Sequence, residues 1–344
     1  MTGVPEENQG PVTLATLAEL VGVHPSTASR ALRGDRRVSP KTIKRVQKLA
    51  GDLGYSPDLT GAALRTRRTR IIGALVPRLT DVVLAEIYEA IDEAAVAAGY
   101  NTFVANTRDD PALQRLRLDG LLSRRVDGLI IGDSRTDSDL VDELARRNIP
   151  FVLIMRRLRD YPSVSTDDLD GGRLAAEHLL SLGHTRVGVI TGDQLTSTGA
   201  ERTLGFTSTY ERAGRALAAD YVVESSFDVH SGRAAGERLL ALPKPPTAIF
   251  AVNDYLAVGV TGAVRAAGLR VGHDVALVGY NDIAISSQLT VPLTSVRSPL
   301  RDMGRQSVEM LLARLDGEQP ASVRLSPTLI ARESTLAGEP NSQK

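Results

Sequence analysis

The chain has 344 residues, 41 basic and 41 acidic side chains and a hydrophobic fraction of 42%, an ordinary composition for a globular protein. It contains no cysteine, which excludes disulfides and thiolate metal sites. The N-terminus is polar, and no apolar run reaches the roughly 18 residues of a membrane span. We therefore expect a cytoplasmic protein with no signal peptide and no membrane partner.

The charges are unevenly distributed along the chain. Residues 1–70 contain 12 Lys and Arg but 6 Asp and Glu, so the remainder has 29 basic and 35 acidic side chains. A basic N-terminal part attached to an acidic remainder is typical of a nucleic-acid-binding module carried by a domain with another task. Charge alone leaves open a solvated basic surface without such a partner.

Two short helices joined by a turn are predicted near the N-terminus. Thr13 can cap a helix over residues 14–21, where apolar side chains recur at helical spacing. Gly22 can end this helix in a left-handed conformation. Pro25 suits the first turn of a second helix, which we expect over residues 25–32. Two short helices around a glycine-containing turn indicate a helix-turn-helix.

The second helix is predicted to expose side chains that suit a DNA groove, and a third helix follows it. Arg30 can hydrogen-bond to guanine O6 and N7 in the major groove. The third helix, over residues 40–50, has a basic face, with Ser39 as its expected cap and Gly51 or Gly54 as its expected end. The residues that we expect the second helix to expose are Pro25, Ser26, Thr27, Ser29 and Arg30.

Particular residues of this N-terminal part, residues 12–57, which we call the head, carry a family resemblance. They are Val12-Thr13-Leu14, Ala18, Gly22-Val23, Pro25-Ser26-Thr27, Ser29-Arg30, Val38-Ser39 and Leu53-Gly54-Tyr55-x-Pro57. In these residues the head resembles the LacI/GalR family of bacterial regulators. Two positions depart from the family, because His24 stands where a capping Ser is usual and Ala28 replaces Val. We interpret His24 as a phosphate contact or an alternative cap rather than a pH switch.

The resemblance implies roles for the exposed residues of the head. Pro25, Ser26 and Thr27 occupy positions that read base edges in the major groove, and Ser29 and Arg30 occupy positions that contact the backbone and bases. The phosphate-side positions are held by Thr13, His24, Arg37, Ser39, Thr42 and Tyr55. We expect binding to operator DNA to weaken steeply as salt is raised.

Residues 58–66 correspond to the family's hinge helix, which forms on operator DNA. Leu64 matches the side chain that wedges into the minor groove, where insertion bends the duplex. Gly61 replaces the usual Ala, and a glycine within a helix costs about 1 kcal/mol. The alternative interpretation of this segment is a flexible linker.

From Ile71 onward, buried strands alternate with amphipathic helices in two series, which indicates two parallel sheets covered by helices. Strands are predicted over residues 71–76, 101–105, 128–131, 150–154, 186–190, 220–224, 247–251 and 275–278. Helices are predicted over residues 82–98, 111–123, 138–147, 172–182, 199–213, 231–241 and 254–267. Two such sheets that face each other form a cleft, and open parallel sheets bind ligands beyond the carboxyl ends of their strands.

The sequence lacks the motifs of the common catalytic sites. No glycine fingerprint for nucleotides follows the first strand, and there is no P-loop, no metal-spaced His pair and no G-x-S-x-G nucleophile motif. We therefore expect no enzymatic activity, no catalytic residue, no cofactor and no metal.

The resemblance continues through the chain as far as Ser334. Its motifs are Ser123-Arg124-Arg125-Val126-Asp127-Gly128, Glu177-His178-Leu179-Leu180-x-Leu182-Gly183-His184, Pro246-Thr247-Ala248-Ile249-Phe250, Asn253-Asp254, Val278-Gly279-Tyr280-Asn281-Asp282 and Leu293-Thr294-Ser295-Val296-Arg297. It implies an all-α helix-turn-helix head and an α/β body, similar to periplasmic binding proteins, that has two parallel-sheet subdomains and forms a homodimer.

The resemblance also implies where the parts of the chain begin and end. We expect a disordered N-terminus over 1–11, the helix-turn-helix domain over 12–57, the hinge helix and linker over 58–70, and the effector-binding and dimerisation domain over 71–338. The N-subdomain of that last domain is expected to cover about 71–166 and 299–326, and its C-subdomain about 167–298 and 327–338.

An effector site in the cleft is implied as well. Arg202 matches the Arg that clamps ligand hydroxyls or carboxylates, Phe227 a ring that stacks on sugars, and Asn253 either a ligand contact or a helix cap. The expected effector-binding residues are Leu79, Thr80, Asp81, Met155, Arg202, Phe227, Asn253 and Asn281. Departures from the family at Met155, Asn281, Val83, Leu84 and Ser298, together with 4% aromatic residues, indicate a more aliphatic pocket than a typical sugar site.

The sequence thus predicts a homodimeric repressor that binds a pseudo-palindromic operator and responds to a small-molecule effector, first of all a sugar or sugar derivative. Three alternatives stay open. The first is a co-repressed regulator with a non-sugar ligand, the second is a cytoplasmic sugar-binding protein without a DNA role, and the third is a Rossmann-type sugar-modifying enzyme.

Overall fold

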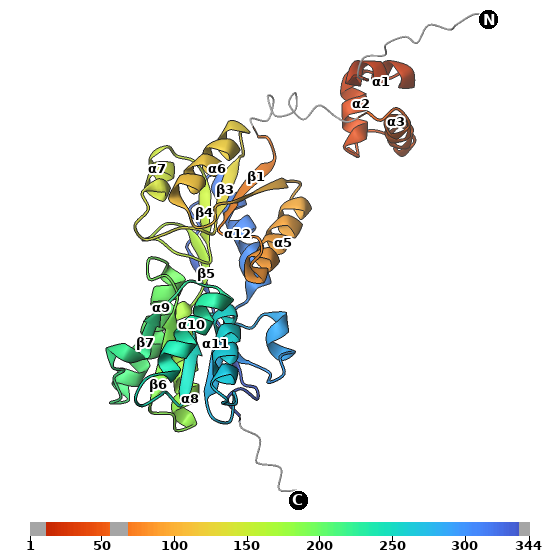
Figure 1. Cartoon of the computed structure of the whole chain (residues 1–344). Helices are drawn as coiled ribbons and strands as arrows, with labels where there is room; N and C mark the ends of the chain where they lie inside the picture. The colour runs from red at the N-terminus through yellow and green to blue at the C-terminus, as the bar shows by residue number, and fades with distance from the viewer. Residues whose placement is uncertain (1–11, 56–67, 337–344) are drawn as a thin grey trace, which may run out of the picture. The chain divides into compact units, whose positions relative to one another are not determined.

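The computed structural model describes residues 12–55 and 68–336, which form two compact units: the head before Arg70 and the body from Arg70 onward (Figure 1). The predicted N-terminal segment 1–11, the predicted hinge over 58–66 and the last two residues of the predicted domain over 71–338 lie outside the described residues. Within the described ranges, no helix has the length and apolar character that a membrane span requires.

The head consists of three helices packed on one small core. They are α1 (Leu14–Val21), α2 (Pro25–Leu32) and α3 (Pro40–Asp52). Thr13 and Ser39 cap α1 and α3 as predicted, and Gly22 ends α1 in a left-handed conformation with φ +68°. Leu17, Ala28 and Val46, one from each helix, have no exposed surface.

The end of α3 differs from the prediction. The helix runs to Asp52, and Gly54, with φ +62°, follows its last turn, whereas Gly51 lies inside the helix. Glycine adopts this left-handed conformation without the steric penalty of a Cβ atom, so Gly54 rather than Gly51 ends α3.

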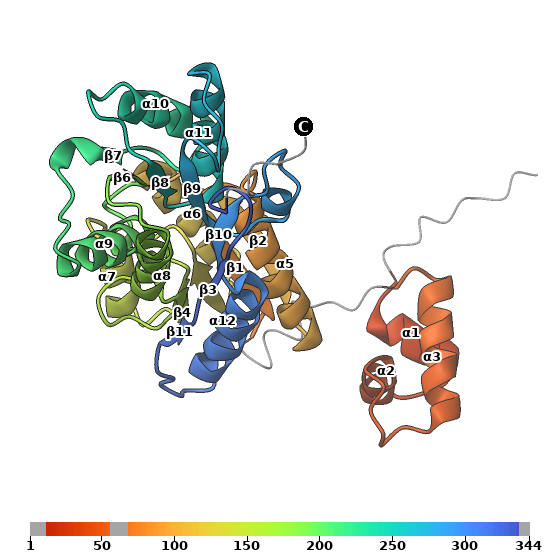
Figure 2. The same ribbon diagram turned by 90° about the horizontal axis from the view of Figure 1, so that it is seen from below.

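The first lobe of the body is a six-stranded parallel sheet in the order β11-β5-β4-β3-β1-β2. Its strands are β1 (Ile71–Val76), β2 (Asn101–Asn106), β3 (Gly128–Ile131), β4 (Phe151–Ile154), β5 (Ser163–Thr166) and β11 (Val323–Leu325). Its helices are α5 (Val82–Ala97), α6 (Pro111–Ser123), α7 (Leu140–Arg146) and α12 (Leu300–Leu315). Helices α5 and α12 lie side by side, as Figure 2 shows.

The second lobe has a six-stranded sheet in the order β12-β10-β9-β8-β6-β7, parallel except for β12, which pairs antiparallel with β10. Its strands are β6 (Val187–Thr191), β7 (Val222–Glu224), β8 (Ala248–Ala251), β9 (Ala276–Asn281), β10 (Thr294–Arg297) and β12 (Thr328–Ile330). Its helices are α8 (Asp168–Ser181), α9 (Ser197–Arg212), α10 (Val229–Leu240) and α11 (Asp254–Ala266), with short 3-10 turns at Ala219–Tyr221 and Ala284–Ser287.

The chain passes between the lobes at three places in the described body: between β5 and α8, between β10 and α12, and between β11 and β12. Consequently α12 packs on α5 and on the first sheet although it follows the second sheet in sequence. Three connections that run together allow the lobes to move as two bodies about a hinge.

Several predicted elements are incomplete or wrong at their ends. Strands β5, β10, β11 and β12 and helix α12 have no counterpart among the predicted elements. Helix α8 begins four residues before the predicted Gly172, because Asp167 caps it by accepting from the Asp170 N–H at 3.2 Å. The predicted strand over 220–224 begins with a 3-10 turn, and only Val222–Glu224 pairs with a neighbour.

Candidate functional site

Helix α2 of the head exposes several of the residues predicted to contact bases. Pro25, Ser26 and Arg30 are exposed, whereas Thr27 and Ser29 are half-buried. The Ser29 hydroxyl accepts a hydrogen bond from Arg33 Nη1 at 3.2 Å. Three of the five predicted base-side residues are therefore fully available at the surface of α2, and the other two lie along its flank.

His24 is the N-cap of α2. Its Nδ1 accepts from the Ser26 N–H at 3.3 Å and lies 2.9 Å from the Ser26 hydroxyl. A capping side chain satisfies a backbone N–H that the first turn of a helix leaves unpaired. The alternative-cap interpretation of His24 therefore agrees with this geometry, and the cap also orients Ser26.

The predicted phosphate-side residues lie at helix ends. The Thr13 hydroxyl lies 2.9 Å from that of Thr16, and the Ser39 hydroxyl 2.8 Å from that of Thr42, so capping pairs occupy the N-termini of α1 and α3. Helix N-termini carry partial positive charge and suit phosphate oxygens. Tyr55 is half-buried against the head core.

Arg37 is already paired within the head. Its Nε and Nη2 donate to the two carboxylate oxygens of Asp35 at 3.0 and 2.7 Å. These hydrogen bonds hold the pKa of Asp35 well below its ordinary value. The Arg37 side chain is 77% exposed, so a phosphate would compete with Asp35 for it. Gly61 and Leu64, the remaining predicted DNA contacts, lie outside the described residues.

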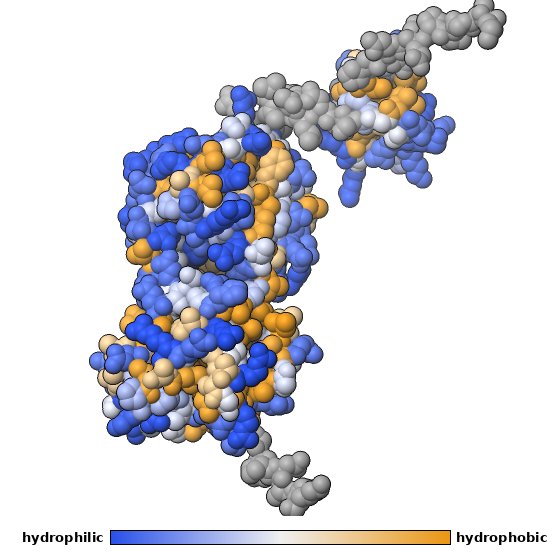
Figure 3. All heavy atoms as spheres, in the orientation of Figure 1, coloured by the Kyte–Doolittle hydropathy of each residue, from blue (hydrophilic) through white to orange (hydrophobic). Residues whose placement is uncertain are grey.

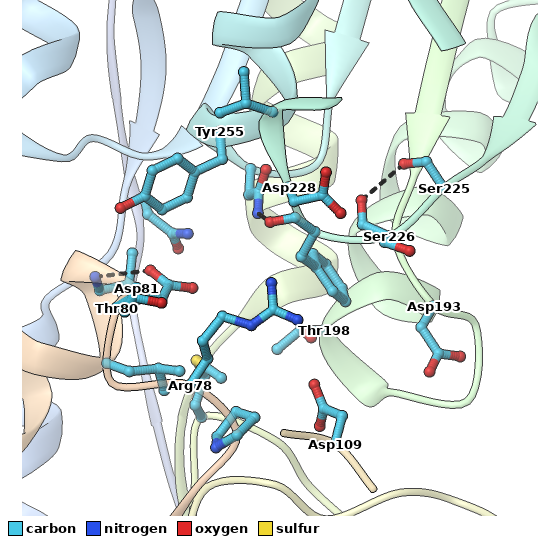
Figure 4. A pocket seen from close by; sticks show the side chains of 18 of the residues that line it. Arg78, Thr80, Asp81, Asp109, Asp193, Thr198, Ser225, Ser226, Asp228 and Tyr255 are labelled. Atoms are coloured by element: carbon cyan, nitrogen blue, oxygen red, sulfur yellow. Dashed lines mark hydrogen bonds between the residues drawn. The ribbon is translucent and has the colours of Figure 1, made fainter. Parts of the chain in front are cut away.

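The body contains a cavity of about 680 Å³ between its lobes (Figure 4). Segments that follow the carboxyl ends of β1, β2 and β4 line it from the first lobe, and segments at the ends of β6, β7, β8 and β9 line it from the second. This is the position where open parallel sheets bind ligands. The size lies within the roughly 300–1,000 Å³ range of small-molecule sites.

Most of the predicted effector residues meet at this cavity. Those that line it are Thr80, Asp81, Met155, Arg202, Phe227, Asn253 and Asn281. Leu79 lies in the same loop as Thr80 but is not among the lining residues, and its side chain is 39% exposed. Val83 and Leu84 also line the cavity, whereas the buried Ser298 donates its hydroxyl hydrogen to Asn281 Oδ1 at 3.2 Å.

Arg202 is fixed by contacts on several sides. Its Nε donates to Asp168 Oδ1 at 2.7 Å, its Nη1 donates to the Val252 carbonyl at 2.8 Å, and its guanidinium carbon lies 3.7 Å from the centre of the Tyr280 ring. Arg202 and Asp168 are both buried, at 3% and 2% exposure. Burial raises the pKa of the Asp168 carboxyl, and the Arg202 charge opposes that rise. Contacts within the second lobe thus fix the position of the Arg202 guanidinium.

Asn253 caps a helix, as one of its two predicted roles required, and also lines the cavity. Its Oδ1 accepts from the Leu256 N–H at 2.8 Å and caps α11, while its Nδ2 donates to the Phe227 carbonyl at 3.3 Å. It is buried and lines the cavity. The Phe227 ring covers Gly192 so closely that a Cβ atom there would lie 2.1 Å from it. Asn253 therefore fixes the Phe227 backbone, and the Phe227 ring packs on Gly192, where a larger residue would not fit.

Three residues that line the cavity have a left-handed backbone conformation. Asp109, Met155 and Asn281 have φ values of +55°, +64° and +98°, and each lies at or just beyond the end of a strand. Non-glycine residues in this region cost about 1–3 kcal/mol and cluster at functional sites.

An ion pair between a buried Arg and a half-buried Asp at the cavity was not predicted. Arg156, 3% exposed, donates through Nη1 and Nη2 to the two carboxylate oxygens of Asp109 at 2.5 and 3.1 Å. The two residues follow different strands, 47 positions apart. The only sequence signal was their position beyond predicted strand ends.

The lobes also touch each other around the cavity. Arg135 Nη1 lies 2.5 Å from Asp193 Oδ2, and the Val82 N–H donates to the Tyr255 hydroxyl at 3.2 Å. Arg157 forms an ion pair with Glu201. Asp193 and Tyr255 also line the cavity, so a ligand would meet side chains that connect the lobes.

Comparison with known proteins gives the same two parts. Residues 13–58 match the family described as bacterial regulatory proteins, lacI family, and residues 176–335 match the periplasmic binding protein-like domain. The chain is 33% identical over 334 residues to the HTH-type transcriptional repressor PurR of Haemophilus influenzae (strain PittEE), a match that covers 94% of this chain and 98% of the relative.

Solved structures have the same architecture. The lac repressor dimer bound to operator and the anti-inducer ONPF is 30% identical, with a TM-score of 0.85 over 95% of this chain and 100% of that one. The transcriptional regulator CelR in complex with cellobiose is 31% identical, with a TM-score of 0.72 over 94% and 99%. The predicted fold class is confirmed, and the relatives are transcriptional regulators rather than enzymes.

Proposed function

Since this chain belongs to the LacI family of bacterial regulatory proteins and is thus a DNA-binding transcription regulator, we propose that it is a homodimeric repressor whose operator affinity is set by a small-molecule effector in the cleft. The supporting observation is a cavity lined by both lobes, at which Asp193 and Tyr255 also form contacts between the lobes. A ligand that contacts these residues acts on the equilibrium between lobe arrangements.

The DNA-binding step uses the paired heads. Each α2 enters the major groove at one half of a pseudo-palindromic operator, with Pro25, Ser26 and Thr27 at base edges. Arg30 supplies the donor geometry for a guanine, and the caps at Thr13 and Ser39 face phosphates. We also propose that Leu64 wedges into the minor groove and that Gly61 keeps that segment from folding without DNA. The protein acts in the cytoplasm, where the nucleoid lies.

Dimerisation is proposed along the side of the first lobe. Val82 and Val96 of α5 and Phe103 of β2 are 42%, 59% and 41% exposed, and β2 is the edge strand of its sheet. Figure 3 shows apolar residues gathered on the side of the body that carries these elements. An exposed apolar surface beside a free sheet edge supports pairing with a second copy.

The effector is proposed to be a sugar or sugar derivative. The Phe227 ring, the Arg202 fork and the amide of Asn253 line one cavity, and a stacking ring beside fixed polar groups suits a polyhydroxylated ligand. The relative CelR is solved with cellobiose. A co-repressed regulator with a non-sugar ligand is the second candidate, which the apolar side chains of Met155, Val83 and Leu84 at the cavity favour.

Selection of genomic fragments by the purified full chain tests this proposal. We expect enrichment of a pseudo-palindromic site, with an affinity that changes when small molecules are added. An equal affinity for every fragment and for random duplex, in all ligand conditions, would contradict it.

A further inference from the structure

We propose that the cleft selects an effector without an anionic group, namely an uncharged sugar or an amino sugar, and rejects phosphorylated sugars and sugar acids. This inference rests on the proposed function, since it takes the cavity as the effector site. Two observations support it: carboxylates surround the cavity, and two of the arginines that line it already form ion pairs within the protein.

Carboxylates surround the cavity from both lobes. Asp81 and Asp109 belong to the first lobe, and Asp193, Glu224 and Asp228 to the second. Figure 4 shows four of them, Asp81, Asp109, Asp193 and Asp228, on different sides of the cavity. A ligand that fills this space therefore meets negative charge whichever way it is oriented.

The guanidinium groups at the cavity are mostly neutralised by the protein itself. Arg156 is buried against Asp109, and Arg202 is buried against Asp168. Arg78 is the exposed third cation of the lining. With the outside partners Asp168 and Arg135 included, the cavity has six carboxyl groups and four guanidinium groups, an excess of two carboxyl groups. An added phosphate or carboxylate would be repelled rather than paired.

Helix N-termini, the usual anion sites of such a cleft, are occupied by the chain's own side chains. Asp81 Oδ1 accepts from the Val83 N–H at 3.0 Å and caps α5. Asp228 Oδ1 accepts from the His230 and Ser231 N–H groups at 2.9 and 3.0 Å and caps α10. The N–H groups that bind an anion at a helix start are thus already paired with carboxylates at these two helices.

These capping carboxylates are instead suited to accept hydrogen bonds from a ligand. In the described part of the chain, Oδ2 of Asp81 and Oδ2 of Asp228 have no hydrogen-bond partner, and both residues line the cavity. Because Oδ1 is fixed by the backbone, Oδ2 is held in place as an acceptor. Sugar hydroxyls and ammonium groups donate to such an oxygen, whereas phosphate and carboxylate oxygens do not.

The experiment uses the full chain and matched sets of common hexoses and pentoses, each tested as the neutral sugar, the amino sugar, the 6- or 5-phosphate and the uronic or aldonic acid. Thermal shift selects binders, and calorimetry measures their affinities. We expect the tightest binder to be a neutral or amino sugar, with its phosphate or acid analogue at least tenfold weaker.

A variant makes the test specific to the charge. Asp228→Asn keeps a capping side chain but removes one negative charge, so the disadvantage of the anionic analogue should shrink severalfold. Asp110→Asn is the matched control, because Asp110 caps α6 in the same way, accepting from the Leu113 N–H at 2.8 Å, and is not among the lining residues. An unchanged preference in Asp228→Asn, or an equal change in Asp110→Asn, contradicts the inference.

The outcomes separate the inference from the proposed function. A phosphorylated sugar or sugar acid that binds most tightly and changes operator affinity overturns the inference and leaves the proposed function intact. If no compound of any class binds or changes operator affinity, the inference fails together with the proposed sugar effector, whereas the proposed repressor function fails only if the selection of genomic fragments finds no preferred site.

Discussion

The body contains side-chain pairs between residues far apart in sequence, whereas the side-chain pairs described in the head are local. In the head, His24 pairs with Ser26, Ser39 with Thr42, and Asp35 with Arg37, all within four positions. In the body, Asp168 pairs with Arg202 at a separation of 34, Asp109 with Arg156 at 47 and Arg135 with Asp193 at 58.

This difference teaches which kind of change each region tolerates. A substitution in the head removes one local interaction at an exposed surface, so its effect on stability is small even where its effect on DNA binding is large. A substitution in the body breaks a contact that joins distant segments, often with buried charge. The two regions form separate compact units, so damage should stay within the unit where it is made.

The largest expected effect is that of Arg202→Ala. Removal of Arg202 leaves Asp168 buried without its cation, and loss of one partner of a buried pair costs about 3–5 kcal/mol. Urea denaturation of the full chain, resolved by amide hydrogen exchange, should place this loss in the body. Below the unfolding transition, effector response should be lost while operator binding persists. A variant as stable as the parent that still responds to effector would contradict the role of this pair.

The next effect is a pH dependence that has opposite signs in the two regions. Burial raises the pKa of Asp254 to about 6, although Ser295, Ile283 N–H and Ser286 donate hydrogen bonds to it. The folded body thus binds this proton more tightly than the unfolded chain. Protonation of Asp254 thus contributes on the order of 3 kcal/mol to the free energy of unfolding, and this contribution is complete below about pH 4 and is lost as the pH rises through 6.

In the head, the pKa of Asp35 is shifted in the opposite direction to that of Asp254. Its hydrogen bonds with Arg37 lower its pKa, so its contribution is present above its ordinary value near 4 and lost at lower pH. The free energy of unfolding of Asp254→Asn and of the parent, measured from pH 4.5 to 7.5, isolates the contribution of Asp254. We expect a weaker dependence on pH in the variant. If the free energy of unfolding changes equally with pH in both proteins, Asp254 does not cause the pH dependence.

Arg30→Ala should have a smaller energetic effect, confined to DNA. Loss of a bidentate contact to guanine costs about 1–3 kcal/mol of operator affinity and relaxes specificity at that base pair. Fluorescence anisotropy on the selected operator measures this change. Lys41→Ala is the comparison, since it removes an exposed cation from the first turn of α3 and should weaken binding to all sequences alike. Equal specificity in Arg30→Ala and the parent would remove Arg30 from base recognition.

His24→Ala should give the smallest effect. Removal of an N-cap costs about 1 kcal/mol of helix stability, whereas His24→Ser supplies a preferred capping side chain and should restore it. Hydrogen exchange of the α2 amides measures the loss. If His24→Ala and His24→Ser protect these amides equally, the histidine does not act as a cap.

The same contrast explains what the sequence could predict. The caps Thr13 and Ser39 and the left-handed Gly22 were predicted correctly, because each depends on residues within one turn of a helix. Helix α12 and strand β5 were missed. The strand sequence Ser163–Thr166 is short and has one apolar residue in four, and its place in the sheet depends on β4 and on β11, which is more than 150 residues away.

In the cleft, the residues that follow strand ends were predictable, because parallel strands bring their carboxyl ends to one edge. Thr80, Met155 and Asn281 do meet there. The Asp109–Arg156 pair and the bridge from Arg135 to Asp193 were not predicted. The first depends on left-handed backbone at Asp109 and at Met155, beside Arg156, and the second on how the two lobes face each other. Neither leaves a periodic pattern in the chain.

The central claim is that occupancy of the cleft and operator binding by the head are energetically coupled. Calorimetry of the full chain with the selected effector, in the presence and absence of the selected operator, measures this coupling most directly. The account predicts that the operator changes effector affinity by the same factor by which effector changes operator affinity, a factor of about 5–150. Equal effector affinity with and without operator would contradict it.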